Sequence, residues 1–128
     1  MKIENIKFKA KRLDNGEWIY GSLIRSTAGI KERAYIVDYF SSMSDYCVIG
    51  VDPSTVCQFT GLKDCEGNEV WEGDIVDVRG VKAEVIWNQE ALAFMVLYEY
   101  ETEPITYLAF INRHSNVLVL HSKFDKEK

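Results

Sequence analysis

The chain has 128 residues, of which 47% are hydrophobic and 12% aromatic, so it holds enough apolar material for a core and is not disordered by composition. Its 15 basic and 20 acidic residues give a net charge of −5, which disfavours sequence-blind binding to duplex DNA because such binding needs clustered positive charge. No apolar run approaches the roughly 20 residues of a membrane span, and the opening residues lack the apolar stretch of a signal peptide. We therefore expect no membrane partner. Three cysteines cannot complete a disulfide framework, so we also expect a cytoplasmic protein.

The alternation of side chains and the spacing of turn residues along the chain are typical of a β-protein. Residues 6–11 alternate apolar and charged side chains, which is the period of a half-buried strand. Asn15 and Gly16 then mark a tight turn, because both tolerate positive φ. By these criteria, and by enrichment in β-branched and aromatic residues, we expect strands at 6–11, 18–24, 34–38, 46–49, 75–78, 81–87, 92–98 and 117–120. Composition predicts a loop at 40–45.

Two segments can be helical. Asp52 followed by Pro53 favours a single helical turn, since Asp is a good cap and Pro a good first residue. Residues 105–111 have too many adjacent apolar side chains for an amphipathic strand and follow Pro104, so a short helix and a buried strand are both open.

Short strands with a turn every ~8–12 residues are typical of a sandwich or barrel. Five strands between about Val70 and Leu120 are enough for a small SH3-like barrel. We therefore expect a mainly β protein with at most one or two short helices. The predicted organisation is a hairpin or small sheet at 1–51 packed on an SH3-like barrel at 52–122, followed by a charged tail at 123–128.

The central residues carry a resemblance. The stretch DPSTVCQFTGLKD at 52–64, followed by EGNEVWEGDIV at 66–76, closely resembles the central signature of the YopX-like family. Residues 7–10 and 18–21 are similar to the N-terminal hairpin of that family. Cys57 stands where the family pattern usually has Gly, and residues 119–124 only faintly match the family ending, which leaves the register of the last strand open. The resemblance implies a mostly β accessory protein of a bacteriophage or prophage, with an SH3-like barrel in its second half. It implies no activity and no catalytic residue, because the family is uncharacterised.

The cysteines and histidines lack the spacing of a metal site. Cys47, Cys57 and Cys65 are ten and eight residues apart, and His114 and His121 are seven apart, so no pair has zinc-finger spacing. No sequence context supports a Cys–His nucleophile pair, and the common nucleotide-binding and hydrolase motifs are missing. We expect no catalytic residue, no metal and no cofactor, and we do not expect an enzyme.

Residues 64–77 contain acidic side chains and no basic one. The acidic residues are Asp64, Glu66, Glu69, Glu72, Asp74 and Asp77. Their spacing is not that of a calcium loop, so turn chemistry is the better interpretation. Residues 66–68 form a tight turn, and in 72–74 the glycine supplies an unusual φ while Asp74 accepts bonds from backbone N–H groups. The acidic face can also steer a basic partner.

A basic row lies near the N-terminus. On an alternating strand Lys7, Lys9 and Lys11 share one face, where such a row usually guards a sheet edge. With Trp18 and Tyr20 nearby, the same row can instead bind single-stranded nucleic acid by stacking. Other aromatic residues in strands are assigned to the core, namely Phe59, Trp71, Trp87, Phe94 and Tyr98.

The resulting functional hypothesis is a binding module for an unknown host or phage protein in the bacterial cytoplasm. The expected contact surface lies on the loops 64–68 and 88–91. Its candidate residues are Asp64, Glu66, Asn68, Asn88 and Glu90. Two alternatives remain: single-stranded nucleic-acid binding through Lys7, Lys9, Lys11, Trp18 and Tyr20, and a homo-oligomer in which the basic start meets the acidic middle or exposed edges pair.

Overall fold

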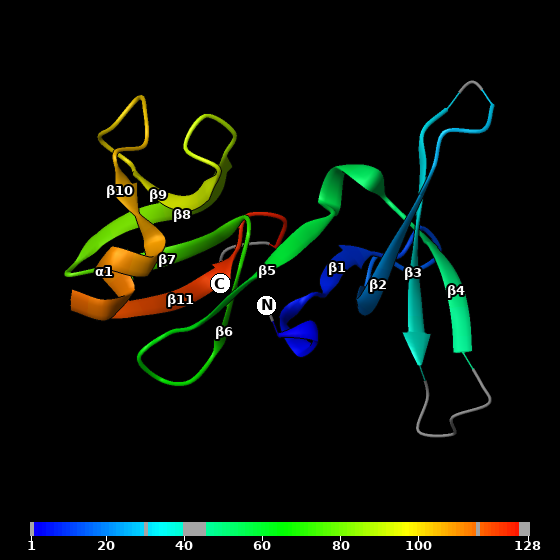
Figure 1. Ribbon diagram of the computed structural model, residues 1–128, viewed down its shortest axis with the longest axis horizontal. Helices are drawn as coiled ribbons and strands as arrows, with labels where there is room; N and C mark the ends of the chain where they lie inside the picture. The colour runs from blue at the N-terminus through cyan, green and yellow to red at the C-terminus, as the bar shows by residue number, and fades with distance from the viewer. Residues whose placement is uncertain (1, 30, 40–45, 115, 126–128) are drawn as a thin grey trace. The chain divides into compact units, whose positions relative to one another are not determined.

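Antiparallel strands dominate the described part of the chain (Figure 1). The computed structural model describes residues 2–29, 31–39, 46–114 and 116–125. The chain divides into two units, unit 1 at Met1–Phe59 and unit 2 at Thr60–Lys128, and each is described by itself. The elements of unit 1 are η1 (Ile3–Asn5), β1 (Phe8–Lys11), β2 (Trp18–Ser26), β3 (Arg33–Tyr39), β4 (Tyr46–Val51), η2 (Pro53–Thr55) and the start of β5 (Cys57–Lys63). Unit 2 holds the rest of β5, β6 (Glu69–Trp71), β7 (Asp74–Val78), β8 (Val81–Asn88), β9 (Ala93–Tyr98), β10 (Thr106–Tyr107), α1 (Leu108–His114) and β11 (Val117–Ser122).

The strands of unit 1 belong to a six-stranded sheet in the order β4-β3-β2-β1-β5-β6, and the pairs from β4 to β5 are antiparallel. The predicted hairpin between residues 6–11 and 18–24 is confirmed as β1 and β2, in which Lys11 pairs with Trp18 and Lys9 with Tyr20. Phe8 and Ala10 point to an apolar cluster, with Ala10, Ile19, Ala34, Ile36 and Val51 buried in it. The lysines of β1 therefore occupy the opposite face, as the alternation predicts.

The predicted helical turn after Asp52 is confirmed as η2. The Asp52 carboxylate accepts a hydrogen bond from the Ser54 N–H at 3.0 Å, and Pro53 opens the turn. Thr55 is buried, and its hydroxyl oxygen accepts a bond from the backbone N–H of Lys11 at 2.9 Å. The turn therefore fixes the end of β1 as well as the entry to β5.

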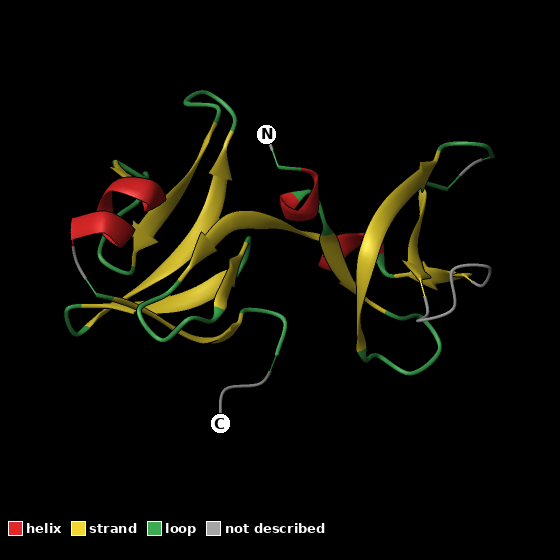
Figure 2. Cartoon of the chain, turned by 60° about the horizontal axis from the view of Figure 1, so that its bottom comes forward, coloured by secondary structure: helices red, strands yellow, loops and turns green. Residues whose placement is uncertain are grey.

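Unit 2 contains a five-stranded sheet in the order β10-β9-β8-β7-β11 (Figure 2). Its core includes Val76, Val85, Val96 and Leu108, all fully buried. The expected closed barrel is not formed by the described residues, because β10 and β11 lie at opposite ends of the sheet. β10 has only two residues before the chain enters α1, which leaves too short an edge for closure.

The last third of the chain resolves two open expectations. Residues 105–111 are both short strand and helix: Thr106 and Tyr107 pair with β9, and α1 then begins at Leu108, whose side chain is fully buried. β11 pairs with β7, with Val117 opposite Val78, and its register shifts at an irregularity between Val119 and His121. This pairing gives the register that the faint match to the family ending leaves open.

Some expectations fall outside the described residues, namely the loop at 40–45 and the last three residues of the tail. Within the described part of the chain, no helix is long and apolar enough to span a membrane.

Candidate functional site

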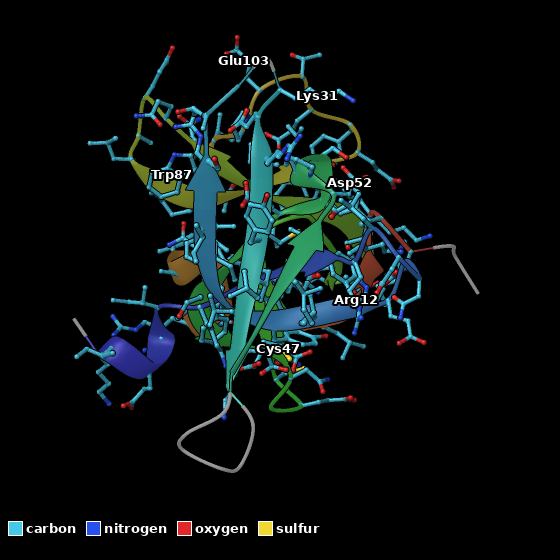
Figure 3. All side chains as sticks on the ribbon, turned by 90° about the vertical axis from the view of Figure 1, so that its right-hand side faces the viewer. Arg12, Lys31, Cys47, Asp52, Trp87 and Glu103 are labelled. Carbon is cyan, nitrogen blue, oxygen red and sulfur yellow. The ribbon has the colours of Figure 1, made fainter. Side chains whose placement is uncertain are left out.

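A hollow of about 410 Å³ lies in unit 2 beside the loops that follow β8 and β9. Its lining residues are Ile86, Trp87, Asn88, Gln89, Glu90, Glu103 and Pro104. The β8–β9 and β9–β10 loops rise from the same side of the sheet in Figure 1, and Figure 3 shows the Trp87 ring beside its strand with Glu103 on the loop above it. We call this the Trp87 hollow. It brings together Asn88 and Glu90, two of the predicted contact residues.

Local hydrogen bonds hold the first of these loops. The Asn88 side-chain oxygen accepts bonds from the backbone N–H groups of Glu90, at 2.9 Å, and of Ala91, at 3.0 Å. Leu92 closes the turn with a φ of 52°, an uncommon conformation for a residue other than glycine. Asn88 therefore acts mainly by fixing the loop, which leaves the exposed Glu90 as the side chain available to a partner.

Trp87 is not a core residue, so its assignment to the core is wrong. Its side chain is 41% exposed, because it lies near the end of β8, where Phe94 meets it edge-on at 5.1 Å between ring centroids. The indole N–H donates to the Gln89 side-chain oxygen at 3.1 Å, which fixes the ring orientation. The core assignment is confirmed for Phe59 and Trp71, which are buried, whereas Phe94 and Tyr98 are partly buried against the core.

The second predicted loop lies apart from this hollow, since none of residues 64–68 lines it. Asp64 is buried, and its carboxylate accepts bonds from the backbone N–H groups of Glu66, Asn68 and Val119 at 2.8–3.0 Å. Burial alone would raise the pKa of Asp64, but the hydrogen bonds from Val119 and Asn68 outweigh it and hold that pKa below its ordinary value. Asp64 thus locks the turn to β11, and the exposed side chains of Glu66 and Asn68 are what the loop presents to solvent.

The prediction for the turn at 72–74 is confirmed. Gly73 has a φ of 84°, and the buried Asp74 carboxylate accepts a bond from the Trp71 N–H at 2.8 Å. The backbone of Gly73 also bonds to Val85 at 2.7 Å and to Lys123 at 2.8 Å, so this turn ties three segments of unit 2 together. The carboxylate of Asp74 is therefore structural.

The basic row of unit 1 lies on aromatic rings. The Lys9 ammonium is 4.4 Å from the centroid of Trp18 and Lys11 is 5.2 Å from the same ring, while Lys7 is 4.7 Å from Phe59. Because β1 is flanked by β2 and β5, Lys9 lies between Tyr20 and Cys57 and is only 7% exposed. The five residues predicted for nucleic-acid contact are thus brought together, but the lysine at their centre is buried in the sheet face.

The cysteines and the described histidine do not form a cluster. None of the three cysteines forms a disulfide, and Cys57 is buried while Cys65 is exposed. His121 Nδ1 lies 2.9 Å from the carbonyl oxygen of Ser122, and the side chain of His114 lies outside the described residues. Among the described residues, no group of three His, Cys, Asp or Glu side chains is placed to hold a metal ion.

The two units differ in charge. Unit 1 has eight basic and seven acidic residues, a net of +1, whereas unit 2 has seven basic and thirteen acidic residues, a net of −6. The Trp87 hollow carries two of those carboxylates, Glu90 and Glu103. Sequence reasoning missed Glu103 and Pro104 as site residues, although the acidic residues that precede this proline are a usable signal for a second exposed loop.

Comparison with known families gives one match. The model described as YopX protein matches residues 7–118. The chain belongs to the YopX family. The resemblance expected from residues 52–76 is therefore confirmed over most of the chain. A search of curated proteins gave no match.

Proposed function

We propose that this YopX-family chain is a non-enzymatic accessory protein of a phage or prophage, which binds a protein partner in the bacterial cytoplasm. The observation that carries the proposal is the Trp87 hollow. It combines a half-exposed indole with apolar Ile86 and Pro104 and two carboxylates. Tryptophan in a partly desolvated recess is the side chain most often responsible for binding energy at protein interfaces.

The charge of unit 2 favours a partner with a basic surface. Its net charge of −6 attracts cations over the whole unit, and Glu90 and Glu103 bring that field to the hollow itself. Nucleic acid is a weaker second candidate. The basic row on which it depends is packed on Trp18 and Phe59, and the chain as a whole repels phosphate.

A pull-down tests the proposal. The tagged chain captures proteins from bacterial host lysate, with and without nuclease, beside the variants Trp87→Ala and Phe110→Ala. Phe110 is a matched control, because it is an exposed aromatic residue of unit 2 that does not line the Trp87 hollow. We expect a stoichiometric protein that survives nuclease, is retained by Phe110→Ala and is lost from Trp87→Ala, with circular dichroism confirming that both variants fold.

Three results would contradict the proposal. Equal retention by Trp87→Ala would remove the hollow from the interaction. Nucleic acid that elutes with salt would favour the basic row, and self-association with nothing else bound would favour the homo-oligomer.

A further inference from the structure

The indole of Trp87 keeps a ring face open to the Trp87 hollow. Phe94 meets the ring at 69° between the two ring planes, and such an edge-on contact covers at most one face of the indole. The indole N–H is already donated to Gln89, so a further partner can be attracted only over the ring face. The side chain is 41% exposed and lines the hollow, which makes that face accessible.

Unit 1 shows which group such a ring face attracts in this protein. The Lys9 ammonium lies 4.4 Å from the centroid of Trp18, and the Lys7 ammonium lies 4.7 Å from the centroid of Phe59. Both contacts place a cation on the electron-rich face of an aromatic ring. Within the described part of the chain, no lysine or arginine lies over Trp87 in this way.

The carboxylates of the hollow are not neutralised by the chain itself. Glu90 and Glu103 line the hollow and are exposed, and neither forms an ion pair with a described lysine or arginine. By contrast Glu84, which does not line this hollow, pairs with Lys123 at 3.3 Å. The lining of the hollow contains no basic residue, so the charge of its two carboxylates is not offset there.

We propose that the Trp87 hollow binds the cationic side chain of a lysine or arginine of the partner protein. This inference rests on the proposed function and adds the chemistry of the group that enters the hollow. The charged end lies over the indole face and is attracted by Glu90 and Glu103, while the methylene stem packs on Pro104. The volume of about 410 Å³ lies within the roughly 300–1,000 Å³ that is usual for ligand sites.

Side-chain probes test this inference by nuclear magnetic resonance. The isotope-labelled full chain is titrated, at constant ionic strength, with the N-acetyl methylamides of lysine, arginine and norleucine. Norleucine has the carbon chain of lysine without the ammonium group, so it separates charge from apolar contact. Binding is followed at the indole N–H signal of Trp87, which is assigned by its disappearance in Trp87→Phe.

We expect the lysine and arginine probes to shift the Trp87 signal saturably, and the norleucine probe to bind about fivefold more weakly or worse. The double variant Glu90→Gln with Glu103→Gln should weaken the lysine probe about fivefold or more. Glu4→Gln with Glu66→Gln is the control, because it removes the same charge from exposed residues that do not line the hollow. This control should change binding by less than about twofold.

Three results would overturn the inference. A norleucine probe that binds as tightly as the lysine probe would replace the cation by an apolar anchor and leave the proposed function standing. Equal weakening in the two double variants would show that net charge attracts the probe, and not the hollow. If no probe shifts the indole signal, the cationic occupant is excluded, and the separate pull-down with Trp87→Ala then decides whether the proposed function stands.

Discussion

Unit 1 and unit 2 place their charged side chains differently. In unit 1 the three lysines of the basic row pack their ammonium groups on aromatic rings, Lys9 and Lys11 on Trp18 and Lys7 on Phe59. In unit 2 two carboxylates, Asp64 and Asp74, are buried as turn locks, while others such as Glu90 and Glu103 line the Trp87 hollow. The basic row, which the sequence offers as the alternative binding site, is therefore packed on aromatic rings, and the acidic residues of unit 2 divide into buried structural ones and exposed ones. Exposure decides which of these charges can meet a partner.

The largest expected effect lies in unit 1, at Gly21. A Cβ at this position would overlap the carbonyl oxygen of Val37 on the neighbouring strand, so the strand pair cannot close without moving. We expect Gly21→Ala to lower the free energy of unfolding by ~3 kcal/mol or more, measured by urea denaturation. Gly50→Ala is the control, because its Cβ would make only an ordinary contact with Leu13 at 3.6 Å. Equal loss in both variants would show that the close approach at Gly21 does not limit stability.

The corresponding test in unit 2 is Asp64→Asn. An amide nitrogen cannot accept the N–H bonds that the carboxylate accepts, so we expect a loss of about 2–4 kcal/mol in the free energy of unfolding. Glu66→Gln changes the same turn without touching these bonds and should be close to neutral. In a Trp18→Phe background the remaining tryptophans, Trp71 and Trp87, both lie in unit 2, so the fluorescence of that variant reports on the unfolding of unit 2.

The same variant gives a pH signature. Because the folded-state pKa of Asp64 is lowered, its contribution is complete above the ordinary value of 3.8 and is lost as pH falls through the lower folded-state pKa. The free energy of unfolding of the wild type should therefore decrease as the pH is lowered below about 3.8, and Asp64→Asn should show a smaller decrease over the same pH range. Parallel curves for the two proteins would contradict the assignment.

The smallest expected effect concerns the basic row. We expect no saturable binding of a fluorescent oligothymidine of about 20 nucleotides, followed by anisotropy at low and moderate salt, because Lys9 is buried and the chain is acidic. If binding does occur, the nucleic-acid alternative requires it to be salt-dependent and to weaken in the double variant Lys7→Glu with Lys9→Glu. Saturable binding with both properties would show that unit 1, and not unit 2, carries the binding surface.

Local signals predicted much of the fold. Alternation in residues 6–11 and the Asn15-Gly16 turn are enough to specify the first hairpin, since both act within one strand pair. The Asp52 and Asp74 turns were also predictable, because each carboxylate bonds to a backbone N–H only two or three residues away. The sequence does not predict that the barrel stays open, because this depends on the tertiary pairing of β10 with β9. Only two residues of β10 pair before α1 begins.

The candidate site was only half predictable. Asn88 and Glu90 are recognisable as loop residues, but Glu103 and Pro104 come to the same hollow only through the pairing of β8, β9 and β10. The exposure of Trp87 depends on its position at a strand end, and flanking Ile86 alone suggests the core. The sequence predicts Asp64 as a contact residue because it lies in a polar turn, whereas its bond to Val119, 55 residues away, is a long-range contact that spacing cannot show.

The position of β11 has a consequence for protein synthesis. The strands of unit 1 have all left the ribosome once Phe59 is clear, so the hairpins of that unit can form early. In unit 2, β7 can pair with β11 only after residues Val117–Ser122 have been synthesised. The hydrogen bond from the Val119 N–H to the Asp64 carboxylate forms equally late. We therefore expect a nascent chain whose first unit is folded while the second is still exposed, and for which chaperone contact concentrates on residues after Phe59.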